Sequence, residues 1–246
     1  MEKDQIFNEG YSKPSDFKFN PAVAGVFDDM VNRSVPFYEE IQRMVAELAA
    51  TSCVSEKDAK VYDLGCSTGT TMAYMHSMVS LDVTFIGVDD SDAMLEKCRY
   101  KLDALFGGKR AYFLSHADLT EDLAIEDASV VILCLTLQFV RPINREKLLK
   151  RIFDGLRHNG VLILVEKVLA EESEFNRDFI RFYYDLKRRH QYSELEISQK
   201  REALENVLIP YKLSENVLLL RNAGFEHCEV FFKWYNFAGL VAKKSL

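Results

Sequence analysis

Apolar residues in the middle of the chain come in short runs, and the stretches between the runs have helical periodicity. The runs cover 60–64, 83–88, 111–115, 129–135 and 161–165. Apolar positions recur every three or four residues over 68–79, 92–105 and 144–156. Strands that alternate with helices in this order predict a parallel sheet covered by helices on both faces.

The amino-terminal residues precede this alternation. Residues 1–18 are polar and aromatic without clear periodicity, so we expect an arm that lies over the surface or across a neighbouring subunit. From Pro21 the apolar spacing predicts a helix, and a second helix follows with Pro36 in its first turn. Ser34 is the candidate cap of this second helix. We assign residues 1–52 to the arm and its helices.

The carboxyl-terminal third breaks the alternation and then returns to strands. Residues 168–218 form a long charged helical region, which we expect to be an insertion or lid over a substrate cavity. Charged runs are usually solvated helix faces, and that alternative stays open. A helix ended by Gly224 follows, and then strands over 228–234 and 237–242. With 48% hydrophobic residues, a chain of 246 residues suffices for one sizeable core, so we expect residues 1–246 to form a single domain.

The first predicted strand runs directly into a turn that contains Gly65 and Gly69. Glycine lets the backbone bend sharply and approach a ligand, and N–H groups that open the next helix can bind an anionic group. Asp63, at the end of the strand, is placed to meet a cation. The spacing differs from the three-glycine dinucleotide fingerprint and resembles the D-x-G-x-G-x-G loop of class I S-adenosylmethionine enzymes, with Cys66 inside it and Ser67 at the middle glycine. A purely structural turn is the alternative on this motif alone.

Acidic residues follow the second predicted strand at the same edge of the sheet. The sequence separation between Gly65 and Asp89 places Asp89 at the carboxyl edge of the neighbouring strand. A carboxylate there can accept hydrogen bonds from both hydroxyls of a ribose. Asp90 lies beside it. The alternative is that Asp90 or Ser91 only caps the following helix, and both roles can coexist in adjacent residues.

Three further positions are candidates for ligand contact. Asp118 follows the third strand and could accept from the exocyclic amine of adenine while Leu119 covers the ring; a loop acid is the alternative, because Asp is frequent in turns. Cys134 ends the fourth strand at the ligand edge, and its alternative is a small buried hydrophobe. Tyr38 lies near the start of the second helix, where position alone favours an ordinary half-buried aromatic as the alternative.

Composition narrows the classes of function. The formal net charge of -7 disfavours a general nucleic-acid-binding surface and favours a small-molecule substrate. The five cysteines are widely separated and include no C-x-x-C pair, so neither a disulfide framework nor a metal site is expected. The amino terminus lacks the apolar core of a signal peptide, and no apolar run reaches the length of a membrane span. We therefore expect a soluble cytoplasmic protein without membrane contact.

Several distinctive strings together resemble one family across about residues 16–242. They are RSVP (33–36), YDLGCS (62–67), LTLQF (135–139), YSELEISQKR (192–201), LENV (204–207) and YNF (235–237). The chain resembles the bacterial carboxy-S-adenosyl-L-methionine synthase family. The resemblance implies a Rossmann-like class I methyltransferase fold with a mostly parallel seven-stranded sheet, a terminal antiparallel hairpin, amino-terminal helices and a helical insertion. One departure is Cys134, where the family pattern carries Asn; the backbone carbonyl there could still hold the ammonium of the ligand.

The family's activity, carried over to this chain, is the carboxylation of the methyl group of S-adenosyl-L-methionine with prephenate as the carbon dioxide source. The products would be carboxy-S-adenosyl-L-methionine and phenylpyruvate, and the former would pass to a tRNA uridine carboxymethyltransferase that modifies the wobble uridine. A homodimer that includes the insertion helices is also implied. By the match, the cofactor and product site consists of Tyr38, Gly65, Cys66, Ser67, Asp89, Asp90, Asp118, Leu119 and Arg201, with Cys134 as a further contact.

A charge argument separates this activity from ordinary methyl transfer. A sulfonium is a cation, and an arginine about 4 Å away would cost on the order of 4 kcal/mol at an effective dielectric near 20. A carboxylate on the methyl group would instead pair with the arginine and accept from a tyrosine hydroxyl. The family resemblance gives these roles to Arg201 and Tyr38, and the alternative for Arg201 is a surface residue of a helix. An ordinary small-molecule methyltransferase and a non-catalytic ligand-binding scaffold are the alternatives.

Overall fold

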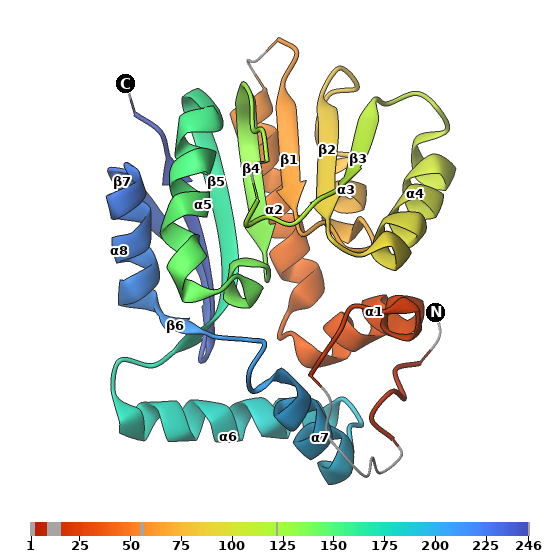
Figure 1. Cartoon of the computed structure of the whole chain (residues 1–246), viewed down its shortest axis with the longest axis vertical. Helices are drawn as coiled ribbons and strands as arrows, with labels where there is room; N and C mark the ends of the chain where they lie inside the picture. The colour runs from red at the N-terminus through yellow and green to blue at the C-terminus, as the bar shows by residue number, and fades with distance from the viewer. Residues whose placement is uncertain (1–2, 9–15, 55–56, 122, 246) are drawn as a thin grey trace.

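The computed structural model describes residues 3–8, 16–54, 57–121 and 123–245 and shows a central sheet with helices on both faces (Figure 1). Its strands follow the order β3-β2-β1-β4-β5-β8-β7. Their bounds are Lys60–Leu64 (β1), Thr84–Asp89 (β2), Tyr112–His116 (β3), Ala128–Cys134 (β4), Leu156–Leu169 (β5), His227–Trp234 (β7) and Phe237–Lys243 (β8). β1 to β5 are parallel, whereas β8 is antiparallel to β5 and β7. The predicted mostly parallel sheet with a terminal hairpin is confirmed, and a short β6, Tyr211–Lys212, adds to the predicted seven strands by pairing with β5.

The helices form two layers on the sheet and a third group beyond its edge. Their bounds are Pro21–Ser34 (α1), Tyr38–Cys53 (α2), Thr70–Met75 (α3), Asp92–Phe106 (α4), Pro142–Gly155 (α5), Ser173–Arg189 (α6), Glu194–Leu204 (α7) and Leu213–Ala223 (α8), with a 3-10 turn at Leu137–Phe139 (η1). α2, α3 and α4 share a hydrophobic core with one face of the sheet, and α5 and α8 share another with the opposite face. α1, α6 and α7 lie beyond the carboxyl ends of the parallel strands (Figure 1).

β4 shows why the strands read as continuous apolar runs. Val130 and Ile132 point into the core under α2, whereas Val131 and Leu133 point into the core under α5. Each of these side chains is fully buried. Because both faces of the strand are covered, hydrophobic side chains are needed at every position rather than at alternate ones.

Ser34 does not cap the second helix, which corrects the sequence prediction. It is the last residue of α1, and its hydroxyl accepts a hydrogen bond from Lys200 Nζ at 3.0 Å. α2 begins at Tyr38, behind Phe37, which has a left-handed φ of 52° and makes no side-chain capping bond. The hydroxyl is therefore used for a contact between distant segments, which the local pattern could not reveal.

Some predicted boundaries also differ. α3 ends at Met75 and not near residue 79, and α5 ends at Gly155, so residues 158–160, whose Asn-Gly pair is typical of a helix end, lie inside β5. A Cβ at Gly155 would lie 2.3 Å from the Ile125 carbonyl oxygen, so only glycine permits this close approach at the end of the helix. β5 continues to Leu169 and α8 begins at Leu213, so the helical insertion consists of α6 and α7 only.

The described part of the amino-terminal arm packs on its own chain. Asp4 is 1% exposed and accepts from the Tyr192 hydroxyl at 2.6 Å, and the Phe17 N–H donates to the Ala203 carbonyl at 2.9 Å. The Asp4 N–H also donates to Asp29 Oδ2 of α1 at 2.7 Å, so the arm ties α7 to α1. Residues 9–15 of the predicted arm lie outside the described residues.

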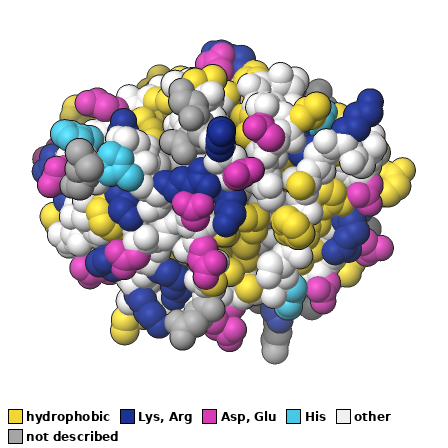
Figure 2. All heavy atoms as spheres, turned by 90° about the horizontal axis from the view of Figure 1, so that it is seen from above, with side chains coloured by type: hydrophobic (Ala, Val, Ile, Leu, Met, Phe, Trp, Pro, Cys, Tyr) yellow, Lys and Arg dark blue, Asp and Glu magenta, His cyan; other side chains and the backbone are white. Residues whose placement is uncertain are grey.

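The surface at the amino ends of the strands is mixed in charge. Figure 2 shows basic and acidic side chains interspersed on this face. Within the described ranges, no helix is both long enough and apolar enough to cross a membrane.

Candidate active site

A cavity of about 570 Å³ lies between the carboxyl ends of the strands and the layer formed by α1, α6 and α7. The structure brings all ten residues of the predicted site to its wall: Tyr38, Gly65, Cys66, Ser67, Asp89, Asp90, Asp118, Leu119, Cys134 and Arg201. The carboxyl edge of an open parallel sheet is where such folds bind ligands. The structure shows that the ten residues line one cavity, and what each of them binds stays a prediction.

The glycine loop has the backbone that its sequence requires. Gly65 and Gly69 both have a φ of 76°, in the left-handed region. A Cβ at Gly65 would lie 2.5 Å from the Thr136 side chain. The N–H groups of Gly65 and Cys66 both donate to the Val88 carbonyl, at 2.7 and 3.0 Å, which holds the loop against β2. The loop therefore packs so closely on the Thr136 side chain that Gly65 leaves no room for a Cβ, and in this conformation it lines the cavity.

Asp89 fixes the other side of this loop. Its Oδ2 accepts from the Ser67 N–H at 2.9 Å and its Oδ1 from the Ser91 N–H at 3.0 Å. Burial raises the pKa of Asp89, while these two backbone hydrogen bonds oppose the rise. Each carboxylate oxygen keeps a second lone pair, so ribose hydroxyls can still be accepted. Ser91 also caps α4 by accepting from the Met94 N–H, so the capping alternative is confirmed for Ser91, while the ligand role of Asp89 stays a prediction.

The adenine candidates lie at the rim. Asp118 is exposed, and its Oδ1 accepts from the Thr120 N–H at 2.7 Å, the turn-forming role considered as the alternative. Among the described residues, its other carboxylate oxygen accepts no hydrogen bond from a backbone N–H. Leu119 is 9% exposed and lines the cavity beside it, while Asp90 is exposed at the same end.

A cluster of polar side chains, Tyr38, Cys134 and Asp63, lies near the glycine loop. Burial, followed by the nearby Cys134, raises the pKa of Tyr38 well above its usual value. The Cys134 thiol accepts from Gln42 Nε2 at 3.5 Å, and burial raises its pKa. Asp63 is 1% exposed, and its Oδ2 has no hydrogen-bond partner in the described part of the chain. Burial raises the pKa of Asp63 to about 7, with Asp89 adding to the effect. Asp63 is not among the residues that line the cavity, so this unsatisfied carboxyl group would act on a bound cation only through the wall of the site.

Arg201 lies at the open side of the cavity. Its side chain is 60% exposed and its nearest carboxylate, Glu202, is 4.0 Å away. Tyr38, by contrast, is half-buried. The two residues line one cavity, from α7 and α2 respectively, as the family resemblance implied.

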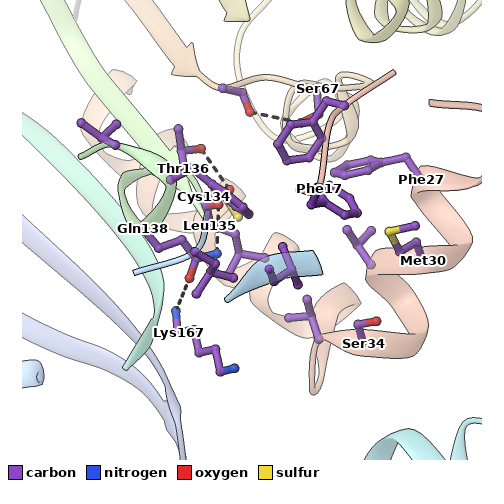
Figure 3. Close-up of a pocket in the computed structure, with 18 of the residues that line it drawn as sticks. Phe17, Phe27, Met30, Ser34, Ser67, Cys134, Leu135, Thr136, Gln138 and Lys167 are labelled. Atoms are coloured by element: carbon purple, nitrogen blue, oxygen red, sulfur yellow. Dashed lines mark hydrogen bonds between the residues drawn. The ribbon is translucent and has the colours of Figure 1, made fainter. Parts of the chain in front are cut away.

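The sequence analysis missed the residues that hold the loop after β4. Glu166 is buried and accepts from the N–H groups of Leu137 and Gln138 at 3.0 and 2.8 Å. The Gln138 side chain accepts from the Lys167 N–H and donates to the Leu135 carbonyl, as Figure 3 shows. Burial raises the pKa of Glu166 to about 8. A signal was available, because an acid at the end of a buried strand is unusual.

An apolar wall faces these polar groups. Phe17, Phe27 and Met30 lie together across the cavity from Cys134 and Leu135 (Figure 3). Phe19, also in the wall, packs edge-on against Phe139 with ring centroids 5.3 Å apart. Aromatic side chains from the arm and α1 thus shield one side of the cavity from water.

Comparison with known proteins first gives the class. Residues 61–160 match the methyltransferase domain family. A solved S-adenosylmethionine-dependent methyltransferase from Aquifex aeolicus has a TM-score of 0.60 at 16% identity, over 92% of this chain and 100% of that one. Human N-acetylserotonin methyltransferase, solved with S-adenosylmethionine, also has a TM-score of 0.60, at 14% identity over 92% of this chain and 56% of that one. The fold is that of S-adenosylmethionine-dependent methyltransferases.

Curated relatives then give the family. The carboxy-S-adenosyl-L-methionine synthase of Methylococcus capsulatus is 52% identical over 99% of this chain and 100% of its own. The synthase of Desulfotalea psychrophila is 47% identical over 98% and 97%. The chain therefore belongs to the carboxy-S-adenosyl-L-methionine synthase family and is a transferase.

Proposed function

We propose that this protein carboxylates the methyl group of S-adenosyl-L-methionine with prephenate and releases carboxy-S-adenosyl-L-methionine and phenylpyruvate. The observation that carries the proposal is one cavity with a glycine loop at one end and basic side chains at the other. Full-length relatives named as synthases of the carboxylated product support it.

The glycine end fits S-adenosylmethionine. Asp89 would accept from the ribose hydroxyls, and the unpaired oxygen of Asp63 would offset the positive charge of the ligand. Leu119 would cover the adenine ring, beside Asp118. Cys134 would contribute its backbone carbonyl, which already accepts from the Thr136 hydroxyl at 3.3 Å.

The second end of the cavity favours a negative ligand group. Arg201 would pair with the carboxylate of the product, and the Tyr38 hydroxyl would donate to it. Because a guanidinium beside a bare sulfonium is repulsive, this placement favours the carboxylated compound over the methyl donor.

The reaction balances without an external base. Cleavage of the bond between the ring and a carboxylate of prephenate releases carbon dioxide, and the electron pair aromatises the ring while hydroxide leaves. The hydroxide takes a proton from the sulfonium methyl group to give water, and the resulting carbon nucleophile binds the carbon dioxide. The protein's part is to hold both molecules away from water, and the wall of Phe17, Phe27 and Met30 shields one side of the cavity.

The product would pass to a tRNA uridine carboxymethyltransferase that modifies the wobble uridine, and the protein would act in the cytoplasm as a homodimer without binding nucleic acid itself. The acidic net charge of -7 agrees with a small-molecule substrate.

The test is to incubate purified protein with S-adenosylmethionine, with and without prephenate, and to analyse the products by mass spectrometry. We expect a product heavier than S-adenosylmethionine by one carboxyl substitution, together with phenylpyruvate, only when prephenate is present. Methyl transfer to a small acceptor, or ligand binding without any turnover, would support the two alternatives and reject the proposal.

A further inference from the structure

Three lysines from three elements line the cavity on the side away from the glycine loop. Lys167 lies in β5, Lys187 in α6 and Lys200 in α7. Figure 3 places Lys167 at the opposite end of the view from Ser67, with Cys134 and Leu135 between them. These lysines thus lie outside the part of the cavity that we assign to the S-adenosyl ligand.

Lys167 and Lys187 share one aromatic ring. Their ammonium groups lie over the ring of Tyr183, 4.9 and 4.8 Å from its centroid. Tyr183 is 7% exposed and packs against Phe237, which also lines the cavity, with ring centroids 5.4 Å apart. The ring therefore holds the two ammonium groups in one small region.

The three lysines differ in their partners. Lys200 donates to the Ser34 hydroxyl at 3.0 Å and lies 3.8 Å from the Asp4 carboxylate. Its ammonium group therefore has a structural role. Lys167 and Lys187 have no carboxylate within 4.0 Å among the residues that the structure describes, and neither ammonium makes a hydrogen bond there. Both lie over the Tyr183 ring, and the more distant Asp4 carboxylate adds some attraction for Lys187.

This arrangement is costly for the protein alone. Lys187 is 4% exposed, and burial lowers its pKa well below the usual value, with Lys200 and Lys167 adding repulsion that the Asp4 carboxylate opposes in part. Burial also lowers the pKa of Lys167 to about 8. Buried lysines are rarely left without an anionic partner, and perturbed groups of this kind in a cavity are typical of functional sites.

We propose that Lys167 and Lys187 bind the carboxylates of the carboxyl donor and so select a dicarboxylate for this end of the cavity. The inference rests on the proposed function, in which the donor carries two carboxylates and a ring. The two ammonium groups match the charge of such a dianion, and the adjoining rings of Tyr183 and Phe237 offer an apolar surface for its carbon skeleton. Lys200 keeps its separate structural role with Ser34 and Asp4.

Lys167→Met and Lys187→Met test this proposal, because methionine keeps much of the apolar stem and removes the charge. Lys243→Met is the matched control, since Lys243 is exposed and ends the strand whose first residue, Phe237, pairs with Lys167. That places the control lysine about 20 Å from the cavity at the usual rise per strand residue. Prephenate is titrated by calorimetry into each protein saturated with S-adenosylhomocysteine, and KM is measured for both substrates.

We expect at least a tenfold weaker prephenate affinity and a tenfold higher KM for prephenate in both cavity variants. S-adenosylhomocysteine affinity should change less than twofold. Lys187→Met should also raise Tm, because it removes a buried ammonium without an ionic partner, whereas a structural role would lower Tm.

A second dicarboxylate, malonate, separates failure of this inference from failure of the proposed function. Carboxylated product formed with an unchanged KM for prephenate in both variants rejects the lysine site and keeps the proposed function. No product from the unmodified protein, together with malonate binding that the variants abolish, keeps the lysine site and rejects prephenate as donor. If the unmodified protein binds neither compound, both are rejected.

Discussion

Arg201 distinguishes carboxylation from methyl transfer, and replacing it with leucine measures that distinction. Arg201→Leu removes the guanidinium and keeps much of the apolar stem. A charge-assisted hydrogen bond contributes roughly 1.5 to 3 kcal/mol. Because 60% of the Arg201 side chain is exposed, solvent screens the pair and we take the lower limit, about 1.5 kcal/mol, or about tenfold in affinity. Affinity for S-adenosylmethionine should stay the same or improve slightly, since a cation near the sulfonium is lost.

The assay is calorimetric titration of both ligands into both proteins, which gives a coupling free energy that does not depend on the general stability of the variant. Arg181→Leu is the control, because Arg181 is 65% exposed on α6 and pairs with Asp178 outside the cavity lining. It should change neither affinity. Equal losses for the two ligands in Arg201→Leu would refute the idea that this residue recognises the carboxylate.

Two further substitutions test the glycine end of the cavity. Asp89→Ala should weaken S-adenosylmethionine and S-adenosylhomocysteine together by roughly 1 to 3 kcal/mol, because the ribose hydroxyls and the Ser67 N–H lose their acceptor; unchanged calorimetric affinity in a folded variant would reject this assignment. Asp63→Asn should flatten the pH dependence of stability. Since burial raises the pKa of Asp63 to about 7, the folded protein keeps a proton that the unfolded chain releases above about pH 4. Stability should therefore fall as pH rises from about 4 to 7 in the unmodified protein and less so in the variant, as thermal melts at several pH values would show.

The parallel sheet and its ligand edge could be predicted because their signals are local. Gly65 follows β1, Asp89 ends β2 and Asp118 comes shortly after β3, and the carboxyl ends of parallel strands meet at one edge. The positions of these residues along the chain therefore predict that they meet at one edge of the sheet. The same reasoning explains why the residues predicted at this edge line one cavity.

The lysine side of the cavity could not be predicted in this way. Lys187 and Lys200 lie in charged helices whose sequence is equally compatible with a solvated surface, and only the packing of α6 and α7 over the strand ends buries them. Ser34 shows the same limit, because its partner Lys200 is far away in the sequence. Contacts between helices of different segments depend on the tertiary arrangement, which periodicity does not specify.

The central claim is tested most directly by the mass of the ligand released when the purified protein is denatured, before and after incubation with S-adenosylmethionine and prephenate. We predict a compound heavier than S-adenosylmethionine by one carboxyl substitution, increasing when prephenate is added. Recovery of only S-adenosylmethionine or S-adenosylhomocysteine under both conditions would contradict carboxylation by this protein.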